Sequence, residues 1–556
     1  MISQTSFNNA KYNFVTATKS SVVVLITISA LFVFLSLCMT SDIQPLEEDA
    51  FITFRYVENF LHGNGLVFNK SERVEVISNI LWALLLAFLS KLGFPLLLTS
   101  AIAGLSFGIL TIWIVWFFTV QYFRRRSYFQ FISALLLATH TSFINACTLG
   151  LETAFYTFLI TIGTISSILE SRKEKAFPYS AIIFSIASIT RPEAPLLFVA
   201  ILLTMIFKDL INHKISKTTI TSLLTFSFIY SFFIVFRIYY YSDILPNTVY
   251  ARASTYPLFG RVLTLFLDYI VNTKSYFIFF PALFLFFRTQ PKKTLYQSIV
   301  VITVSVILLF FSTNGLHFVR YLCPMLPLCF ILVQEGIFEI SIIIQRSVNV
   351  KHYKHLFIII LLSFIVLINF LGHTIKLSFG DNIKYNPMRL SLKSILSDTS
   401  IIRKKVHIWC NLDYDLPQNF QALFGDWIRR NIPKNSIIMY DQMGQTPFYA
   451  GLSYTFIDSF GLTDKVITEI KNNRTTKIRN MALKLFPKVK RNTNQNSLTF
   501  SNYILSRNPD FIFIFVGSEH LARLTSTVKF NREYQKYFPD VPVNLRAGYR
   551  KISVRN

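Results

Sequence analysis

Charged side chains are scarce in this sequence, where only 15% of the 556 residues are Asp, Glu, Lys or Arg and 52% are hydrophobic. This balance excludes an ordinary water-soluble protein and predicts a chain embedded in a membrane. Acidic residues are fewer than basic ones, 29 against 55. The basic residues come in short runs between apolar stretches, such as Arg124 to Arg126. That pattern indicates membrane lipid as a partner and argues against nucleic acid.

Cysteine is also rare, and the five that are present show neither metal-ligand spacing nor a paired framework. This excludes a zinc site built from cysteines and a disulfide scaffold. The apolar segment from about residue 20 to 40 follows Lys11 and Lys19 and resembles a signal peptide. It is too long for a signal-peptide core and lacks a small-residue cleavage site, so we expect the first transmembrane helix there.

Long apolar runs predict eleven transmembrane helices, because each could cross a hydrocarbon core of ~30 Å. They lie near residues 20–40, 95–122, 127–147, 153–170, 176–190, 194–208, 218–240, 273–288, 295–311, 320–343 and 355–372. The run from Ile80 to Leu89 would cover only about 15 Å, which predicts a juxtamembrane or re-entrant helix.

With this count, every basic cluster between spans falls on one side of the membrane, which we predict to be cytoplasmic. An odd number of spans then places the polar stretch 373–556 outside. Its short apolar runs alternate with helix-compatible segments, which is typical of an α/β domain. The expected fold is an α-helical polytopic protein of a bacterial inner membrane. It has a cytoplasmic N-terminus, a transmembrane module over 1–372 with a first periplasmic loop at 41–79, and a periplasmic α/β domain over 373–556.

The first outer loop carries an acidic cluster directly before an amphipathic pattern. Phe51, Phe54 and Val57 recur at helical spacing, and Gly63 supplies a stop. Asp49 would lie in the first turn, where the helix dipole favours negative charge. An alternative interpretation is an interfacial helix with ordinary end charges.

Other charged and polar groups lie at the same predicted face, at the ends of spans. They are Glu75, Asn79, Glu152, Arg191, Glu193, Asn247, Tyr250, His317 and Arg320. Charges beside spans are costly unless they are paired or face a wet cavity. One alternative is therefore that Arg191 and Glu193 only neutralise each other. The set also fits transfer of a sugar from a polyprenyl-phosphate carrier, in which a carboxylate deprotonates the acceptor hydroxyl and arginines hold the departing phosphate.

Several motifs resemble the GT-C glycosyltransferases related to the mycobacterial terminal arabinofuranosyltransferase. They are Glu48-Asp49-Ala50-Phe51-Ile52-Thr53-Phe54-Arg55-Tyr56, Gly63-Asn64-Gly65, Gly150-Leu151-Glu152-Thr153, Thr190-Arg191-Pro192-Glu193, Leu245-Pro246-Asn247-Thr248, Arg320-Tyr321-Leu322 and Tyr440-Asp441-Gln442-Met443-Gly444. The resemblance implies a GT-C fold, and by position it implies Asp49 as the catalytic base with Glu48 beside it. Glu48 stands where an Asp-Asp pair is usual.

We accordingly expect an inverting glycosyltransferase that acts on an envelope glycan or glycolipid in lipopolysaccharide or cell-wall biosynthesis. The expected sugar donor is linked to polyprenyl phosphate, and a pentofuranose such as arabinose is one candidate sugar. Expected to bind the donor phosphate are Arg55, Arg191, His317 and Arg320; expected to bind substrate are Glu75, Asn79, Glu152, Glu193, Asn247, Tyr250 and Asp441. A divalent cation at Glu48 and Asp49 remains open.

Two alternatives use the same outer face. A flippase or transporter of lipid-linked glycans would place charges near the bilayer midplane and show inverted repeats. The charges here lie at span ends, and no repeat is clear. A ligase that moves a whole glycan from its carrier would need similar arginines, whereas the acidic first loop favours transfer of a single sugar.

Overall fold

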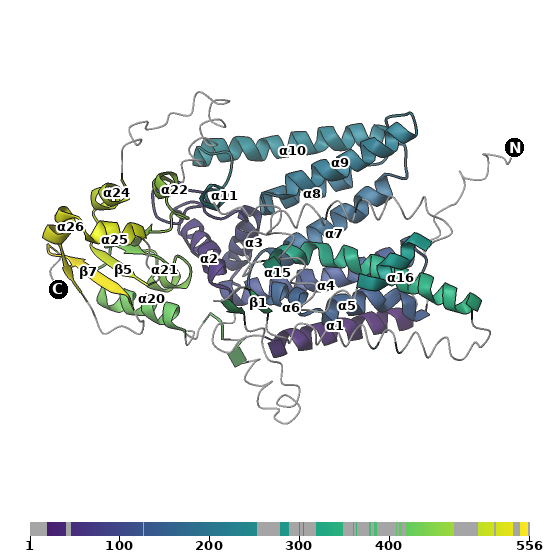
Figure 1. Ribbon diagram of the computed structural model, residues 1–556, viewed down its shortest axis with the longest axis horizontal. Coiled ribbons are helices and arrows are strands. Elements are labelled where there is room, and N and C mark those ends of the chain that lie inside the picture. Colours follow the sequence, from purple (N-terminus) through teal and green to yellow (C-terminus); the bar gives the residue numbers. More distant parts are fainter. Residues whose placement is uncertain are drawn as a thin grey trace.

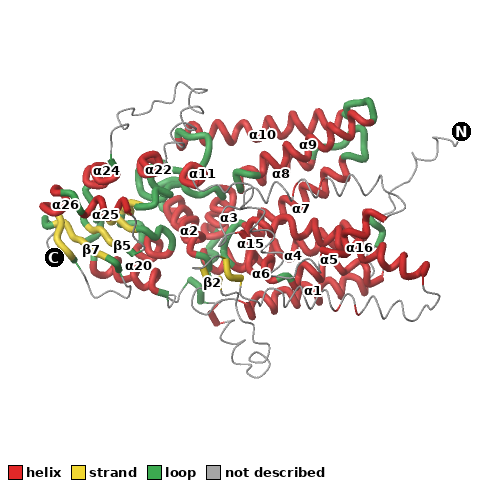
Figure 2. The backbone as a smooth tube through the Cα atoms, viewed as in Figure 1, coloured by secondary structure: helices red, strands yellow, loops and turns green. Residues whose placement is uncertain are grey.

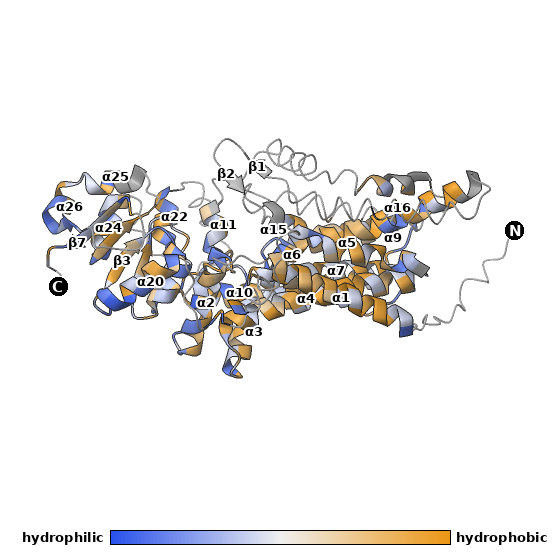
Figure 3. Cartoon of the chain, turned by 90° about the horizontal axis from the view of Figure 1, so that it is seen from below, coloured by the Kyte–Doolittle hydropathy of each residue, from blue (hydrophilic) through white to orange (hydrophobic). Residues whose placement is uncertain are grey.

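The computed structural model describes residues 19–39, 46–125, 127–252, 279–287, 318–347, 377–379, 383–385, 407–408, 411–413, 419–471, 499–515, 519–537 and 545–553, with the single residues 300, 304, 360 and 363. Helices form one long bundle, and a smaller domain with a β-sheet lies at one end of it (Figure 1). Hydropathy follows the same division, since the bundle is largely apolar and the smaller domain mixes polar and apolar residues (Figure 3).

The helices of the bundle and of its outer loops follow the chain in order. They are α1 (Lys19–Met39), α2 (Glu48–Leu61), α3 (Ile80–Lys91), α4 (Leu96–Tyr122), η2 (Ser127–Phe131), α5 (Ile132–Thr139), α6 (Thr141–Thr148), α7 (Thr153–Glu170), α8 (Tyr179–Thr190), α9 (Ala194–Ile211), α10 (Lys217–Tyr241), α11 (Asn247–Arg252), η3 (Phe280–Phe287), α15 (Phe318–Leu322), η4 (Cys323–Met325) and α16 (Leu326–Ser347).

Six helices in the described part of the chain are long and apolar enough to cross a membrane, so the protein is a multi-pass membrane protein. They correspond to predicted spans, as do the shorter α8 and the pair α5 and α6. The prediction of one continuous helix over 127–147 is wrong, because α5 and α6 meet at His140 with a bend of 59°. The predicted spans near 273–288, 295–311 and 355–372 lie largely outside the described residues, so the count of eleven stays a prediction.

Small residues let these helices pack closely. A Cβ atom at Gly104 of α4 would overlap the main-chain oxygen of Cys147 in α6, and one at Gly108 would lie 2.8 Å from both Cys147 Sγ and Phe32 of α1. Close helix contact through small residues is a common way to hold a bundle together in lipid, where burial of apolar surface contributes little.

Basic clusters of the predicted cytoplasmic side lie close to one another. Lys214 pairs with Glu174, and the Arg172 guanidinium lies 3.7 Å from the Tyr122 ring centroid, so three predicted cytoplasmic clusters meet at one end. The first outer loop and the β-sheet domain lie together at the opposite end (Figure 1).

The C-terminal domain contains a five-stranded sheet of order β4-β3-β5-β7-β6, which agrees with the α/β prediction (Figure 2). Its elements are α20 (Phe420–Asn431), β3 (Ile437–Tyr440), α21 (Gln445–Ala450), β4 (Thr455–Asp458), α22 (Lys465–Lys471), α24 (Phe500–Arg507), β5 (Phe511–Ile514), α25 (Glu519–Thr525), α26 (Val528–Glu533), β6 (Tyr534–Lys536) and β7 (Ala547–Lys551); β1 (Leu377–Phe379) and β2 (Ile383–Tyr385) form a separate antiparallel pair. Strands β4, β3 and β5 are parallel, while β7 runs antiparallel to β5 and β6.

Side chains alternate between the two faces of this sheet. Tyr440 and Phe513 pack in the same hydrophobic cluster as the bundle core, together with Phe424 of α20. Met439 and Ile512 belong to a second cluster with residues of α22 and α24. Both faces are therefore covered, and one of them is continuous with the membrane module.

Candidate active site

The first outer loop is fastened to the C-terminal domain by Arg55, which is fully buried in α2. Its guanidinium donates to the main-chain oxygens of Phe68 (3.1 Å), Pro447 (2.5 Å), Gly451 (3.0 Å) and Tyr454 (2.8 Å). Three of these acceptors lie in the C-terminal domain. We therefore replace the expected phosphate-binding role of Arg55 with a structural one.

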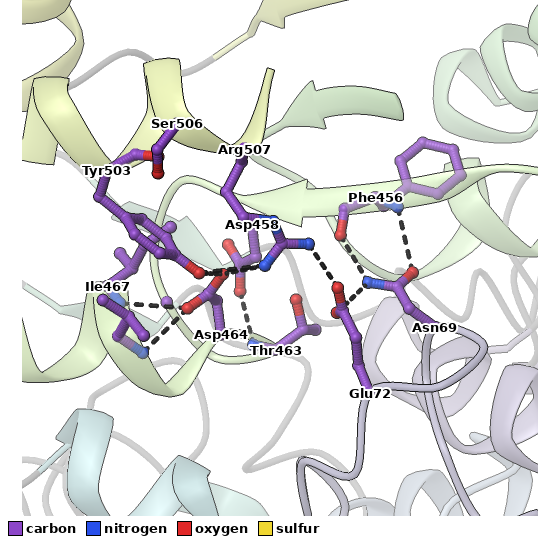
Figure 4. Close-up of polar contacts among 12 residues, drawn as sticks. Asn69, Glu72, Phe456, Asp458, Thr463, Asp464, Ile467, Tyr503, Ser506 and Arg507 are labelled. Atoms are coloured by element: carbon purple, nitrogen blue, oxygen red, sulfur yellow. Dashed lines mark hydrogen bonds and ion pairs between the residues drawn. The ribbon is translucent and has the colours of Figure 1, made fainter. Parts of the chain in front are cut away.

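A second polar cluster reinforces this junction (Figure 4). The Asn69 amide donates to the Phe456 oxygen (2.8 Å) and accepts from the Phe456 N–H (3.0 Å), as a strand neighbour would. Arg507 of α24 pairs with Glu72 of the first loop and, at 3.2 Å, with Asp464. Burial raises the pKa of Asp464, whereas the hydrogen bond with Tyr503 and the charge of Arg507 act in the opposite direction. The loop and the domain thus form one structural unit.

Two residues expected to bind substrate serve the fold instead. Glu75 is fully buried against Arg237 of α10, with Nε–Oε2 2.7 Å and Nη2–Oε1 2.8 Å. Burial raises the pKa of Glu75 to about 7 despite this partner. The Asn247 amide donates to the main-chain oxygens of Gly461 and Leu462, both at 2.8 Å.

Asp441 also has a main-chain partner, since its carboxylate accepts from the Phe515 N–H at 3.1 and 3.2 Å. Tyr250 is buried, and His317 lies outside the described residues. The sequence interpretation missed Arg237. Its position in an otherwise apolar helix was a usable signal, because a charge there requires a partner.

Four of the expected residues contact one another through a series of hydrogen bonds and ion pairs. Asn79 donates to Glu152 (2.7 Å), and Arg191 contacts both Glu152 (3.3 Å) and Glu193 (2.7 Å). All four side chains are buried. Two carboxylates thus neutralise Arg191, which supports the alternative that it is a structural residue.

Asp49 and Arg320 form a different kind of pair. Asp49 lies in the first turn of α2, Arg320 lies in α15, and their Oδ2 and Nη1 atoms are 3.2 Å apart. The Asp49 side chain is 35% exposed and that of Arg320 is 17% exposed. Arg320 is therefore the cation that pairs with Asp49 in the structure. The pair is an accessible acid and cation at the end of the bundle that faces the domain.

Glu48 connects this pair to the C-terminal domain. Its carboxylate accepts the Gln445 N–H at 2.9 Å. A Cβ atom at Gly444 would overlap the main-chain oxygen of Glu48, so only glycine allows this approach. Burial, opposed by the Gln445 N–H and assisted by the charges of Asp49 and Glu47, raises the pKa of Glu48 to about 7.

The donor set at α2 does not fit a metal ion. Among the residues that the structure describes, no group of three or more His, Cys, Asp or Glu side chains could hold one. Glu48 is engaged by Gln445, and Asp49 by Arg320. We assign no cation to these two carboxylates.

Known proteins resemble this chain in its C-terminal domain and in its overall fold. Residues 413–554 match a family model described as "Domain of unknown function (DUF8728)". No curated protein matches the chain. The crystal structure of ArnT from Cupriavidus metallidurans bound to undecaprenyl phosphate is similar at a TM-score of 0.54, with 11% identity over 97% of this chain and 99% of that one.

The chain has the fold of this ArnT structure. The apo structure of the same ArnT gives a TM-score of 0.48 at 12% identity, covering 96% of this chain and 98% of that one. The likeness to the ArnT structure is one of fold, and it does not extend to the arabinofuranosyltransferase subfamily that the sequence motifs resemble.

Proposed function

We propose that this protein is an inverting glycosyltransferase that moves a sugar from a polyprenyl-phosphate donor to a glycan or glycolipid of the cell envelope. The observation that carries the proposal is the accessible pair of Asp49 and Arg320 at the end of a GT-C helix bundle. The fold likeness to ArnT, crystallised with undecaprenyl phosphate, supports a polyprenyl-linked donor. We place the protein in a bacterial inner membrane with the pair and the C-terminal domain on the periplasmic side.

The reaction follows from the two groups. An acceptor hydroxyl attacks the anomeric carbon while Asp49 takes its proton. The bond from the anomeric carbon to the phosphate oxygen breaks, and its electron pair leaves with the polyprenyl phosphate. The Arg320 guanidinium donates to the phosphate as its charge increases. Attack from the face opposite the leaving group inverts the anomeric centre.

The decisive experiment is sugar transfer by purified protein in liposomes. The donors are a panel of polyprenyl-phosphate sugars, with arabinofuranose included because of the motif resemblance, and the acceptor is the envelope glycan fraction of cells that lack the protein. Asp49→Asn should lower transfer by ~10²-fold or more, because it keeps the shape but removes the proton-accepting charge. Glu58→Gln is the matched control, a carboxylate of the same helix whose ion-pair partner among the described residues is the exposed His62.

Three outcomes would contradict the proposal. The first is a normal rate for Asp49→Asn. The second is movement of intact lipid-linked sugar across the bilayer without bond cleavage, which would indicate a transporter. The third is transfer of a whole glycan in place of one sugar, which would indicate a ligase. The orientation is tested separately: a reporter fused after Arg126 should be cytoplasmic, and one at the C-terminus periplasmic.

A further inference from the structure

The strand order of the C-terminal sheet reverses at β3, an arrangement that often places a ligand site at the edge of a sheet. The first of its three parallel strands, β3, is central, and β4 and β5 lie on either side of it. Helix α21, between β3 and β4, packs on one face, and α22 and α24, between β4 and β5, pack on the other. The connection after β3 leads to β4 on one side of it, whereas the connection after β5 leads to β6 and β7 on the other side. In such sheets ligands bind beyond the carboxyl ends of the two strands that flank this switch. Here those ends are Asp441 and Phe515, which are hydrogen-bonded to each other.

This edge of the sheet abuts the candidate active site. The loop that follows β3 reaches α2, where the Gln445 N–H meets the carboxylate of Glu48. Gly444 lies against the main chain of the same residue. Asp49 is the next residue of α2, so a molecule held at the carboxyl edge would lie beside the proposed base.

The side chains at this edge suit a sugar. Phe420, the first residue of α20, is 44% exposed, and its ring packs on that of Phe515 with centroids 5.0 Å apart. An exposed aromatic face can cover the C–H face of a sugar ring, as it covers other apolar surfaces. The preceding residue, Asn419, is 7% exposed, and its Oδ1 accepts the Ala422 N–H at 3.0 Å.

Two amide groups at the edge have unused hydrogen-bonding capacity. Asn419 Nδ2 and Gln445 Oε1 are buried and have no hydrogen-bond partner within the described residues. A buried polar atom without a partner destabilises the fold. One of these atoms is a donor and the other an acceptor, which is what a sugar hydroxyl can satisfy.

We propose that the carboxyl edge of the C-terminal sheet, formed by Asn419, Phe420, Gln445 and Phe515, is a saccharide subsite that holds the acceptor glycan beside Asp49. The acceptor role rests on the proposed function, whereas saccharide binding at this edge does not. The subsite gives the domain of unknown function a role in recognising the acceptor.

The test measures glycan binding and lipid binding separately, on full-length protein in nanodiscs. The glycan probe is the water-soluble envelope glycan fraction of cells that lack the protein, followed by saturation-transfer NMR. The lipid probe is undecaprenyl phosphate. Phe420→Ala should weaken glycan binding about tenfold, which corresponds to about 1.4 kcal/mol, and leave lipid binding unchanged. Asn419→Ser keeps a capping oxygen for α20 but removes the amide donor, so it should also weaken glycan binding.

Phe460→Ala is the matched control, because Phe460 is a second exposed aromatic residue (38%) of the same domain and contacts Lys471. It should bind the glycan as the wild type does. The subsite is refuted if the wild type shows no saturation transfer, or if Phe420→Ala binds the glycan normally. If the glycan binds through Phe420 but the lipid does not bind, the subsite stands and the proposed function fails.

Discussion

Replacing Arg55 with methionine should detach the C-terminal domain from the membrane module. The substitution keeps an apolar stem but removes the guanidinium, which donates to four main-chain oxygens at 2.5 to 3.1 Å. Each buried oxygen left without a donor costs about 1–3 kcal/mol. The four costs are not additive, and burying a methionine avoids desolvating a charge. We therefore expect a loss of about 4 kcal/mol, at the upper end of single-residue effects.

The assay is thermal unfolding of the purified full-length protein in detergent, followed by limited proteolysis. A loss of this size should lower the Tm by about 10 °C for a domain of this length and expose the junction to protease. Arg55→Lys keeps a charge but cannot reach four oxygens with one ammonium group, so its Tm should lie between those of wild type and Arg55→Met.

Arg73→Met is the control, because Arg73 lies in the same loop, is exposed, and has its guanidinium 4.8 Å from the Tyr240 ring centroid. Such a contact is worth about 0.5–1 kcal/mol. If Arg55→Met and Arg73→Met melt at the same temperature, Arg55 does not hold the domain. A stable Arg55→Met protein that has lost lipid binding would restore the phosphate-binding role.

Three further predictions concern buried charges. The pKa of Glu48 in the folded protein, about 7, lies above the ordinary value of 4.5. The protonated Glu48 side chain therefore contributes most to stability below pH 4.5, and this contribution is lost as the pH rises to about 7. The Tm of Glu48→Gln should exceed that of wild type by more at pH 8 than at pH 5. Arg237→Met leaves Glu75 buried without its partner and should cost about 3–5 kcal/mol, part of which Glu75→Gln in the same chain should restore in a double-mutant cycle. Asp413 accepts two N–H groups at the start of α4 at 2.7 and 2.8 Å, so Asp413→Asn should lower the stability by about 1 kcal/mol, measured by thermal unfolding.

Local pattern predicted local structure well. The spacing of apolar residues from Glu48 to His62 indicated a helix that ends before Gly63, and α2 spans Glu48–Leu61. The same approach failed over 127–147, where the polar run Thr139 to Ser142 interrupts the apolar residues. His140 has an extended backbone there, with φ −81° and ψ 114°, and it interrupts the helix. That conformation depends on packing around a buried residue, which apolar periodicity does not encode.

The candidate site shows the same limit. The rule that charges at span ends need partners suggested the pair of Arg191 and Glu193, to which the structure adds Glu152 and Asn79. It could not predict which arginine forms an ion pair with Asp49. Arg55 is six residues from Asp49 along the chain, yet three of its acceptors are almost 400 residues distant, in the C-terminal domain. Only the tertiary fold shows that Arg320, 271 residues from Asp49, is the partner.

This difference between the arginines bears on where a donor phosphate can bind. Arg55, Arg191 and Arg237 are buried and hold several oxygens each, so a phosphate could engage them only by leaving those oxygens without donors. Arg320 is partly exposed and meets Asp49 through one N–H at 3.2 Å. A guanidinium has five N–H donors, and a partly exposed ion pair is typically worth only about 0–1 kcal/mol. The donor phosphate is a diester with one negative charge and gains a second as the sugar leaves, so it can share or displace this contact at little cost. When the phosphate takes over the Arg320 contact, Asp49 no longer shares that guanidinium at the moment when the acceptor proton must be removed.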